Sequence, residues 1–280
     1  METYTVVKAL NNNVIIAHHP TYQEVVLIGK GIGFEKKKND QIESAIIEKL
    51  FILKDEHEQS NYKKLLDHID EGFIETMNDL IFYIQSKIPT RLNEHIHLAL
   101  TDHIAFALRR MEQGLDIKNP FIVETKALYP LEYRIAKEVT EILNQKLAVS
   151  LPEGEVGFIA LHIHSAITSK RISEVNLHSQ LISKLIDLIE QTLFIVIDPD
   201  SIHYLRLIRH LQHAIERVIA GEEVEEPHML TEVLREEYPL CYNLSWKLIK
   251  IMQQTLKKPV CHAEACYLTM HLQRLTKKIK

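Results

Sequence analysis

The chain has 280 residues, of which 46% are hydrophobic and 25% are charged, and its formal net charge is −5. This composition is typical of a folded soluble protein of two or three domains, and it excludes a disordered chain and a protein that binds nucleic acid through bulk positive charge. The three cysteines are odd in number and lie in the last forty residues, so the sequence predicts a reducing, cytoplasmic environment without a disulfide framework. No signal peptide follows Met1, and the apolar segment at residues 156–169, which is free of Lys, Arg, Asp and Glu, is too short to span a bilayer, so we expect no stable membrane insertion.

The N-terminal segment has the pattern of a small β domain. Three runs rich in Val and Ile, YTVVKAL, NVIIAHH and EVVLIGK, are separated by the turn-forming clusters NNN and HPTYQ. Residues Leu50 to Asp55 predict a fourth strand. We therefore expect residues 1–58 to form an antiparallel β domain, which is so small that oligomerisation is the usual way to stabilise it.

Helical periodicity begins after a polar link at residues 56–61. Leu65, Ile69, Phe73 and Met77 recur at steps of four, and most of the remaining chain follows the same period. A second polar link, residues 168–176, separates two helical blocks.

The two helical blocks repeat each other. Residues 100–114 align with residues 207–221 at an offset of 107, and YPLEY (129–133) aligns with YPLCY at an offset of 109. An ordered series of matches at a nearly constant offset predicts two homologous all-α helical-bundle domains, residues 62–170 and 175–280. The matched pairs include Leu100 and Leu207, His103 and His210, Ala107 and Ala214, Arg110 and Arg217, Gly114 and Gly221, Glu155 and Glu264, and His162 and His271.

The repeat keeps one histidine on each of two helices in each domain. His164, in contrast, falls opposite Gln273 and has no counterpart. A single histidine at the edge of an amphipathic helix is usually only a tolerated residue, but packing alone does not explain four at matched positions. A neutral imidazole is nucleophilic near pH 7 and can accept a phosphoryl group, which adds nearly two negative charges. Paired histidines in duplicated domains therefore favour a phosphorylation switch.

Glu155 precedes His162 by two helical turns and also recurs in the second domain. We expect it to be a helix-start or interface residue, because Ser150 and Glu153 match the S-x-x-E capping box. A metal-dependent hydrolase that uses Glu155, His162 and His164 is the alternative from another functional class. It needs three or four converging ligands, and the segment CHAEAC has no counterpart in the first repeat.

Several longer motifs point to one family. They are KALNNNVIIA (8–17) and EVVLIGKGIGFEKKKND (24–40) in the N-terminal segment, and LNEHIHLALTDHIAFALRR (92–110), LPEGEVGFIALHIHSA (151–166), YLRLIRHLQHAIERV (204–218) and AEACYLTMHLQRL (263–275) in the helical blocks. With these motifs the chain resembles transcriptional antiterminators regulated by the sugar phosphotransferase system, and most of all the glucose-specific members. Those proteins have an N-terminal co-antiterminator RNA-binding domain followed by two regulatory (PRD) domains.

The resemblance implies that a homodimer binds a leader-RNA hairpin and prevents a terminator from forming, so that a glucose permease gene is expressed. By motif match the RNA contacts fall on Lys8, Asn11, Asn13, Gly29, Lys30, Gly31 and Phe34. Asn can read base edges, Gly allows close approach of the backbone, Phe can stack on a base, and Lys meets phosphate. Lys30 stands where some members have arginine, which puts a bidentate base contact at that position in doubt.

The resemblance also implies a role for each matched histidine. His103 and His162 would be phosphorylated by the glucose permease (enzyme II), which turns the protein off, with His103 as the leading acceptor. His210 and His271 would be phosphorylated by the phosphocarrier protein HPr. We expect phosphate in the first domain to place like charges across a symmetric dimer interface. The family implies no enzymatic activity, no cofactor, no metal and no DNA partner, and the strand-like N-terminal segment shows no helix-turn-helix pattern.

Overall fold

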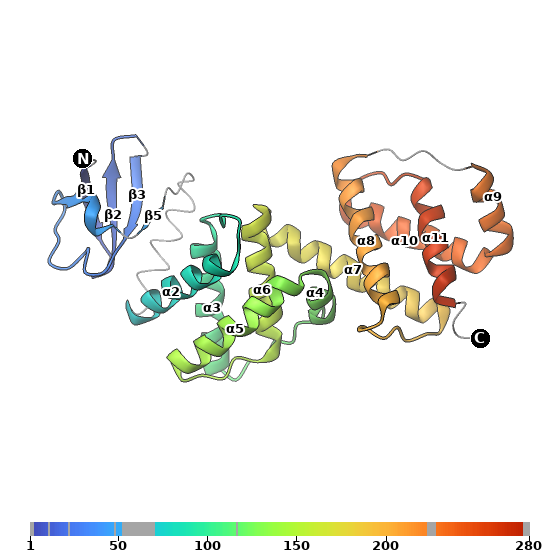
Figure 1. The fold of residues 1–280 in the computed structure, drawn as a ribbon, viewed down its shortest axis with the longest axis horizontal. Helices are drawn as coiled ribbons and strands as arrows, with labels where there is room; N and C mark the ends of the chain where they lie inside the picture. Colours follow the sequence, from blue (N-terminus) through green and yellow to red (C-terminus); the bar gives the residue numbers. More distant parts are fainter. Residues whose placement is uncertain are drawn as a thin grey trace. The chain divides into compact units, whose positions relative to one another are not determined.

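The computed structural model describes residues 3–10, 12–21, 23–47, 49–51, 71–115, 117–222 and 228–276. A small antiparallel sheet is followed by α-helices, which confirms the predicted fold class (Figure 1). By internal contacts the chain divides into two units, residues 1–117 with 135–169 and residues 118–134 with 170–280. Residues 118–134 thus group with the second unit, although the repeat assigns them to the first helical domain. Among the described residues, no helix has the length and apolar character needed to cross a membrane.

The sheet has the strand order β4-β1-β2-β3-β5, and every neighbouring pair of strands is antiparallel. The central strand β2 is buried on both faces, because Ile15 and Ala17 point into one apolar cluster while Val14 and Ile16 point into another. The alternation of side chains along a strand separates these two sets. The strands are β1 (Thr3–Ala9), β2 (Val14–His19), β3 (Gln23–Ile28), β4 (Gln41–Glu43) and β5 (Lys49–Phe51).

Among the described residues the sheet has five strands, one more than the sequence predicted. β4 is only three residues long and pairs with β1 through Tyr4 and Ile42, so it is too short to show a period-two pattern. The strand expected at Leu50 to Asp55 corresponds to β5, which begins at Lys49. Residues 52–55, like Leu65 and Ile69 of the helical pattern, lie outside the described residues.

The helices of the first unit are α2 (Glu71–Lys87), α3 (Ile96–Glu112), most of α5 (Pro130–Leu147) and α6 (Glu153–Thr168). Those of the second unit are α4 (Ile122–Leu128), α7 (Ile172–Leu193), α8 (Ile202–Ala220), α9 (His228–Glu237), α10 (Pro239–Leu256) and α11 (Ala263–Thr276). The repeat relates α3 to α8, α5 to α10, and α6 to α11.

The paired helices α3 and α8 end in the same way. Gly114 and Gly221 follow them with φ near the left-handed region, at 69° and 70°. A glycine adopts this conformation without the strain that a Cβ atom would cause, and it ends a helix by turning the chain away. The repeat therefore preserves a stop signal as well as the apolar stripe.

The predicted capping box at the start of α6 is wrong. The N-cap residue is Pro152, no side chain caps the helix there, and Ser150 lies two residues too early. Proline fits this place because its extended backbone (φ −67°, ψ 155°) leads into the helix. Glu155 lies in the first turn of α6, as expected of a helix-start residue, but its side chain has buried partners described below.

Candidate functional site

Most of the residues predicted to contact RNA lie in two adjacent loops at one end of the sheet. The first loop joins β1 to β2, and the second follows β3. Two backbone bonds join these loops: the Gly29 amide donates to the Asn13 carbonyl at 3.0 Å, and the Gly33 amide donates to the Asn12 carbonyl at 2.8 Å. The structure therefore brings together segments that are about twenty residues apart in sequence.

The Asn13 side chain has a structural contact in this region. Its Oδ1 accepts a hydrogen bond of 2.8 Å from the Gly31 amide. Gly31 has φ 70°, a conformation that glycine adopts freely. Asn13 thus fixes the shape of the second loop, a role that the sequence analysis did not assign to it.

Exposure divides the predicted RNA-contact residues. Lys8, Lys30 and Gly31 are exposed, as is Phe34, which exposes 61% of its surface although it is large and apolar. Gly29, in contrast, is buried. An exposed Phe in the same loop as an exposed lysine offers a stacking surface and a positive charge in one segment. Asn11 lies outside the described residues.

The structure brings His103 of α3 and His162 of α6 together, as the repeat suggested. Their ring centroids are 4.8 Å apart and the ring planes are inclined by 38°. His103 also lies 5.7 Å from the ring of Phe158, one turn before His162. The matched positions of the first helical domain are therefore a pair in space, on facing surfaces of two helices.

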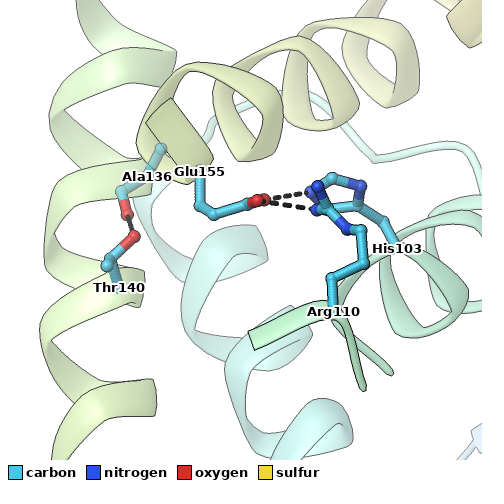
Figure 2. A network of polar contacts seen from close by, with 5 residues as sticks. All are labelled: His103, Arg110, Ala136, Thr140 and Glu155. Carbon is cyan, nitrogen blue, oxygen red and sulfur yellow. Dashed lines mark hydrogen bonds and ion pairs between the residues drawn. The ribbon is translucent and has the colours of Figure 1, made fainter. Parts of the chain in front are cut away.

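Glu155 links His103 to a buried arginine, Arg110 (Figure 2). One carboxylate oxygen lies 2.9 Å from Nε2 of His103, and the other accepts a hydrogen bond of 2.8 Å from Nη2 of Arg110. The Glu155 side chain is only 2% exposed. Burial alone would raise the pKa of its carboxyl, but the hydrogen bonds and charges of His103 and Arg110 outweigh burial and hold that pKa below its ordinary value.

An ionised Glu155 determines the tautomer of a neutral His103. A carboxylate can only accept a hydrogen bond, so Nε2 of His103 carries the proton in their contact. The lone pair of the neutral ring is then on Nδ1. Sequence reasoning missed Arg110 as a partner, although it is matched by Arg217 in the repeat.

The second pair, His210 of α8 and His271 of α11, is packed more closely. The rings are stacked with centroids 3.5 Å apart. Here the matched glutamate, Glu264, accepts two hydrogen bonds from Arg217, at 2.7 Å from Nε and 2.8 Å from Nη2. The glutamate is thus occupied by arginine in the second domain, whereas in the first it is shared between arginine and histidine.

Three of the four histidines have a pKa below the usual value. Burial and the neighbouring His103 and His95 lower the pKa of His162 to about 3. Burial, His210 and two arginines lower that of His271 to about 4, and burial with neighbouring positive groups also lowers the pKa of His210. These three imidazoles are therefore neutral at pH 7, the form with a nucleophilic lone pair.

The alternative of a metal site requires three or four converging ligands. Within the part of the chain that the structure describes, no group of three or more His, Cys, Asp or Glu side chains is arranged to hold a metal ion. Both oxygens of Glu155 are engaged by His103 and Arg110. The arrangement is that of paired histidine rings on duplicated helical domains.

Comparison with known proteins agrees with this architecture. Residues 4–60 match the CAT RNA binding domain, and residues 78–166 and 183–275 match the PRD domain. The chain therefore belongs to the family of transcriptional antiterminators with a CAT RNA-binding domain and two PRD domains, RNA-binding regulators controlled by the phosphotransferase system. The domain boundaries predicted from the sequence, at residues 58, 62, 170 and 175, remain a prediction.

Individual relatives cover nearly the whole chain. The PtsGHI operon antiterminator of Bacillus subtilis (strain 168) is 58% identical over 277 residues, which are 99% of this chain and 99% of that protein. The GlcA/glcB genes antiterminator of Staphylococcus carnosus (strain TM300) is 42% identical over 280 residues, with 99% and 98% coverage. A solved structure, the crystal structure of GlcT CAT-PRDI, is 60% identical with a TM-score of 0.54, and the match covers 59% of this chain and 99% of that one.

Proposed function

We propose that this antiterminator binds a leader-RNA hairpin of a glucose permease gene as a homodimer and prevents an overlapping terminator from forming. The names of its relatives, which refer to the PtsGHI operon and to the glcA and glcB genes, support the glucose assignment. The pairing of histidine rings in each helical domain is the observation that carries the regulatory part of the proposal.

The RNA surface consists of the two loops at the end of the sheet and the adjoining end of β1. Lys8 of β1 and Lys30 bind phosphates, Phe34 stacks on an unpaired base, and the exposed Gly31 allows the backbone to approach. Asn13 holds the Gly31 loop in place, and Asn11 contributes a donor and an acceptor to base edges. The tie between the two loops supports their action as one surface.

In the first domain, the permease phosphorylates His103, with His162 as its partner. The lone pair on Nδ1 of His103 attacks phosphorus, the bond from phosphorus to the donor breaks, and the donor keeps the bonding electrons. The proton on Nε2 remains in the hydrogen bond with Glu155, which stabilises the positive charge that the ring gains on attack. Glu155 and Arg110 therefore position the acceptor and do not themselves react.

Phosphate on His103 then opposes the active state. The phosphoryl group carries about two negative charges and places them close to the buried Glu155 carboxylate. In a symmetric dimer it also places like charges across the interface. Both effects shift the population toward a form that does not bind RNA. In the second domain, the phosphocarrier protein HPr phosphorylates His210 and His271.

The switch is tested with two substitutions at one position. In a strain with a leader-reporter fusion, His103→Asp mimics phosphate and is expected to abolish expression, whereas His103→Ala is expected to make expression independent of glucose. In binding assays with the leader RNA, the purified His103→Asp variant should bind more weakly than the purified His103→Ala variant. A normal glucose response in both variants would contradict the proposed switch.

The RNA surface is tested with a matched pair of exposed phenylalanines. Phe34→Ala removes a stacking contact worth about 1–3 kcal/mol, so the dissociation constant for the leader RNA should rise by roughly five- to 150-fold. Phe194 is 94% exposed and lies after α7, outside the sheet, so Phe194→Ala is the control and should bind normally. Equal affinity of the two variants would exclude Phe34 from the RNA surface.

A further inference from the structure

The second histidine pair lies in positively charged surroundings. His210 is exposed, and His271, which stacks on it, is partly exposed. Arg206 and Arg274 act electrostatically on both rings, and Arg217 acts on His210. This concentration of positive charge around two neutral imidazoles is not explained by the packing of the helices.

The register of α8 and α11 places these arginines. Arg217, two turns after His210, bonds to Glu264, which lies two turns before His271. The two helices are therefore antiparallel. Arg206 lies about one turn before His210, and Arg274 lies about one turn after His271. In antiparallel helices both arginines are therefore on the same side of the histidine pair, and the ion pair of Arg217 with Glu264 is on the other side.

Both arginines are available to a ligand. Arg206 and Arg274 are exposed, and neither has a hydrogen bond or an ion pair with any residue that the structure describes. Arg217 differs, because Nε and Nη2 of its guanidinium already donate to Glu264. Two uncompensated guanidinium groups beside a pair of nucleophilic rings form a site suited to a small dianion.

The first domain is an internal control for this interpretation. At the positions that match Arg206 and Arg274 it has Ala99 and Ser165. The same pair of helices thus packs without arginine at either position. Of the two domains, only the second has arginine at these two matched positions.

We propose that Arg206 and Arg274 form the binding site for the phosphoryl group that the second histidine pair carries. This inference rests on the proposed function, in which His210 and His271 are phosphorylated. The bond from phosphorus to the donor breaks, a bond from phosphorus to a ring nitrogen forms, and the donor keeps the electron pair. The guanidinium groups donate N–H bonds to the phosphoryl oxygens and exchange no proton.

The two domains consequently respond to the same modification in opposite ways. A phosphoryl group on the first pair meets a carboxylate, whereas one on the second pair gains two cationic partners. The second domain should hold its phosphoryl group longer, and it should do so without disturbing a buried network.

The test uses the full chain with His103→Gln and His162→Gln, so that only the second domain can accept phosphate. This protein is phosphorylated with phosphoenolpyruvate, enzyme I and the phosphocarrier protein, the donors are removed, and the loss of phosphohistidine is followed by ³¹P NMR. The double change Arg206→Ala and Arg274→Ala should shorten the lifetime by roughly fivefold or more, a modest value because both groups are exposed. The double change to Lys, which keeps the charge, should restore part of the lifetime.

The control is Arg209→Ala, which removes an exposed positive charge from α8 directly beside His210 in sequence but on a different face of the helix. It should keep the normal lifetime. An unchanged lifetime in the double alanine variant would overturn the inference, and so would slower transfer with a normal lifetime, because the arginines would then serve only to dock the donor.

A second measurement separates this inference from the proposed function. Inorganic phosphate is titrated into the unphosphorylated chain, and the ring signals of His210 and His271 are followed by NMR. The signals should move in the parent protein and in Arg209→Ala but not in the double alanine variant. If the second domain accepts no phosphoryl group, the proposed function fails there, and the titration alone decides whether the arginine site exists.

Discussion

The contrast between the two glutamates leads to a quantitative prediction. Glu155→Gln removes the negative charge between His103 and Arg110 while it keeps the shape of the side chain. Glu264→Gln makes the same change in the second domain, where Arg217 is the hydrogen-bonding partner. We expect the first substitution to cost much more stability than the second, because the two networks differ in burial.

The magnitude follows from the exposure of the partners. A hydrogen bond to a charged group contributes about 1.5–3 kcal/mol, and removal of one member of a buried charged pair costs about 3–5 kcal/mol. Since Arg110 is 9% exposed and the Gln oxygen can still serve one donor, we expect a loss of about 3 kcal/mol for Glu155→Gln. Arg217 is 31% exposed, so water can replace part of its bond, and about 1 kcal/mol is expected for Glu264→Gln.

The single tryptophan makes the two domains distinguishable in one assay. Trp246 lies on α10 and packs against the core of the second unit, so its fluorescence reports on that unit, while circular dichroism reports on all helices. In urea at pH 7, Glu155→Gln should move an unfolding transition seen by circular dichroism by about 1.5 M, for a slope of about 2 kcal/mol per M. The fluorescence transition should stay in place, and Glu264→Gln should move it by about 0.5 M.

The reasoning is refuted if Glu155→Gln lowers the free energy of unfolding by less than about 1 kcal/mol, or by no more than Glu264→Gln does. A matching chemical result is expected from NMR of the ring nitrogens. Neutral His103 should carry its proton on Nε2 in the parent protein and lose that preference in Glu155→Gln. The ring-nitrogen signals of His210 should be the same in the parent protein and in Glu155→Gln.

Two further predictions concern stability. Because the pKa of His162 falls to about 3 in the folded protein, its contribution to stability is complete above an unfolded pKa near 6.5 and is lost as the pH falls below it. The loss should be about 2 kcal/mol between pH 7 and 5, and His162→Gln should flatten this dependence in urea titrations. Phe194 ends α7 with φ 54°, so Phe194→Gly should stabilise the protein by roughly 0.5–1 kcal/mol in thermal unfolding. Phe194→Ala, which keeps the Cβ atom, should not, and equal effects of the two would rule out backbone strain as the cause.

The sequence was sufficient for the architecture and for the histidine pairs. Runs rich in Val and Ile between turn-forming clusters identified β1, β2 and β3. The repeat paired His103 with His162 and His210 with His271, because side chains at matched positions of matched helices face each other in both copies. The short strand β4 was missed because three residues carry no recognisable period.

The same reasoning could not predict the polar networks. The repeat matched Glu155 with Glu264 and Arg110 with Arg217, yet it could not show that one glutamate also binds a histidine. That difference depends on how each side chain turns within a helix pair, at the scale of about one ångström, and no sequence period encodes it. The structural use of Asn13 was hidden for a similar reason, since its partner Gly31 is eighteen residues away.

The ion pair between arginine and glutamate joins the same two helices in both copies, Arg110 to Glu155 and Arg217 to Glu264. From the homology of the two copies we infer that the domain from which they were duplicated already had this link. The neighbours of the link differ between the copies: a histidine shares the carboxylate in one, and two arginines distinguish the other. Under the proposed function, the two copies are two receivers of a single chemical signal, and the residues around the shared ion pair are the place where their responses can differ.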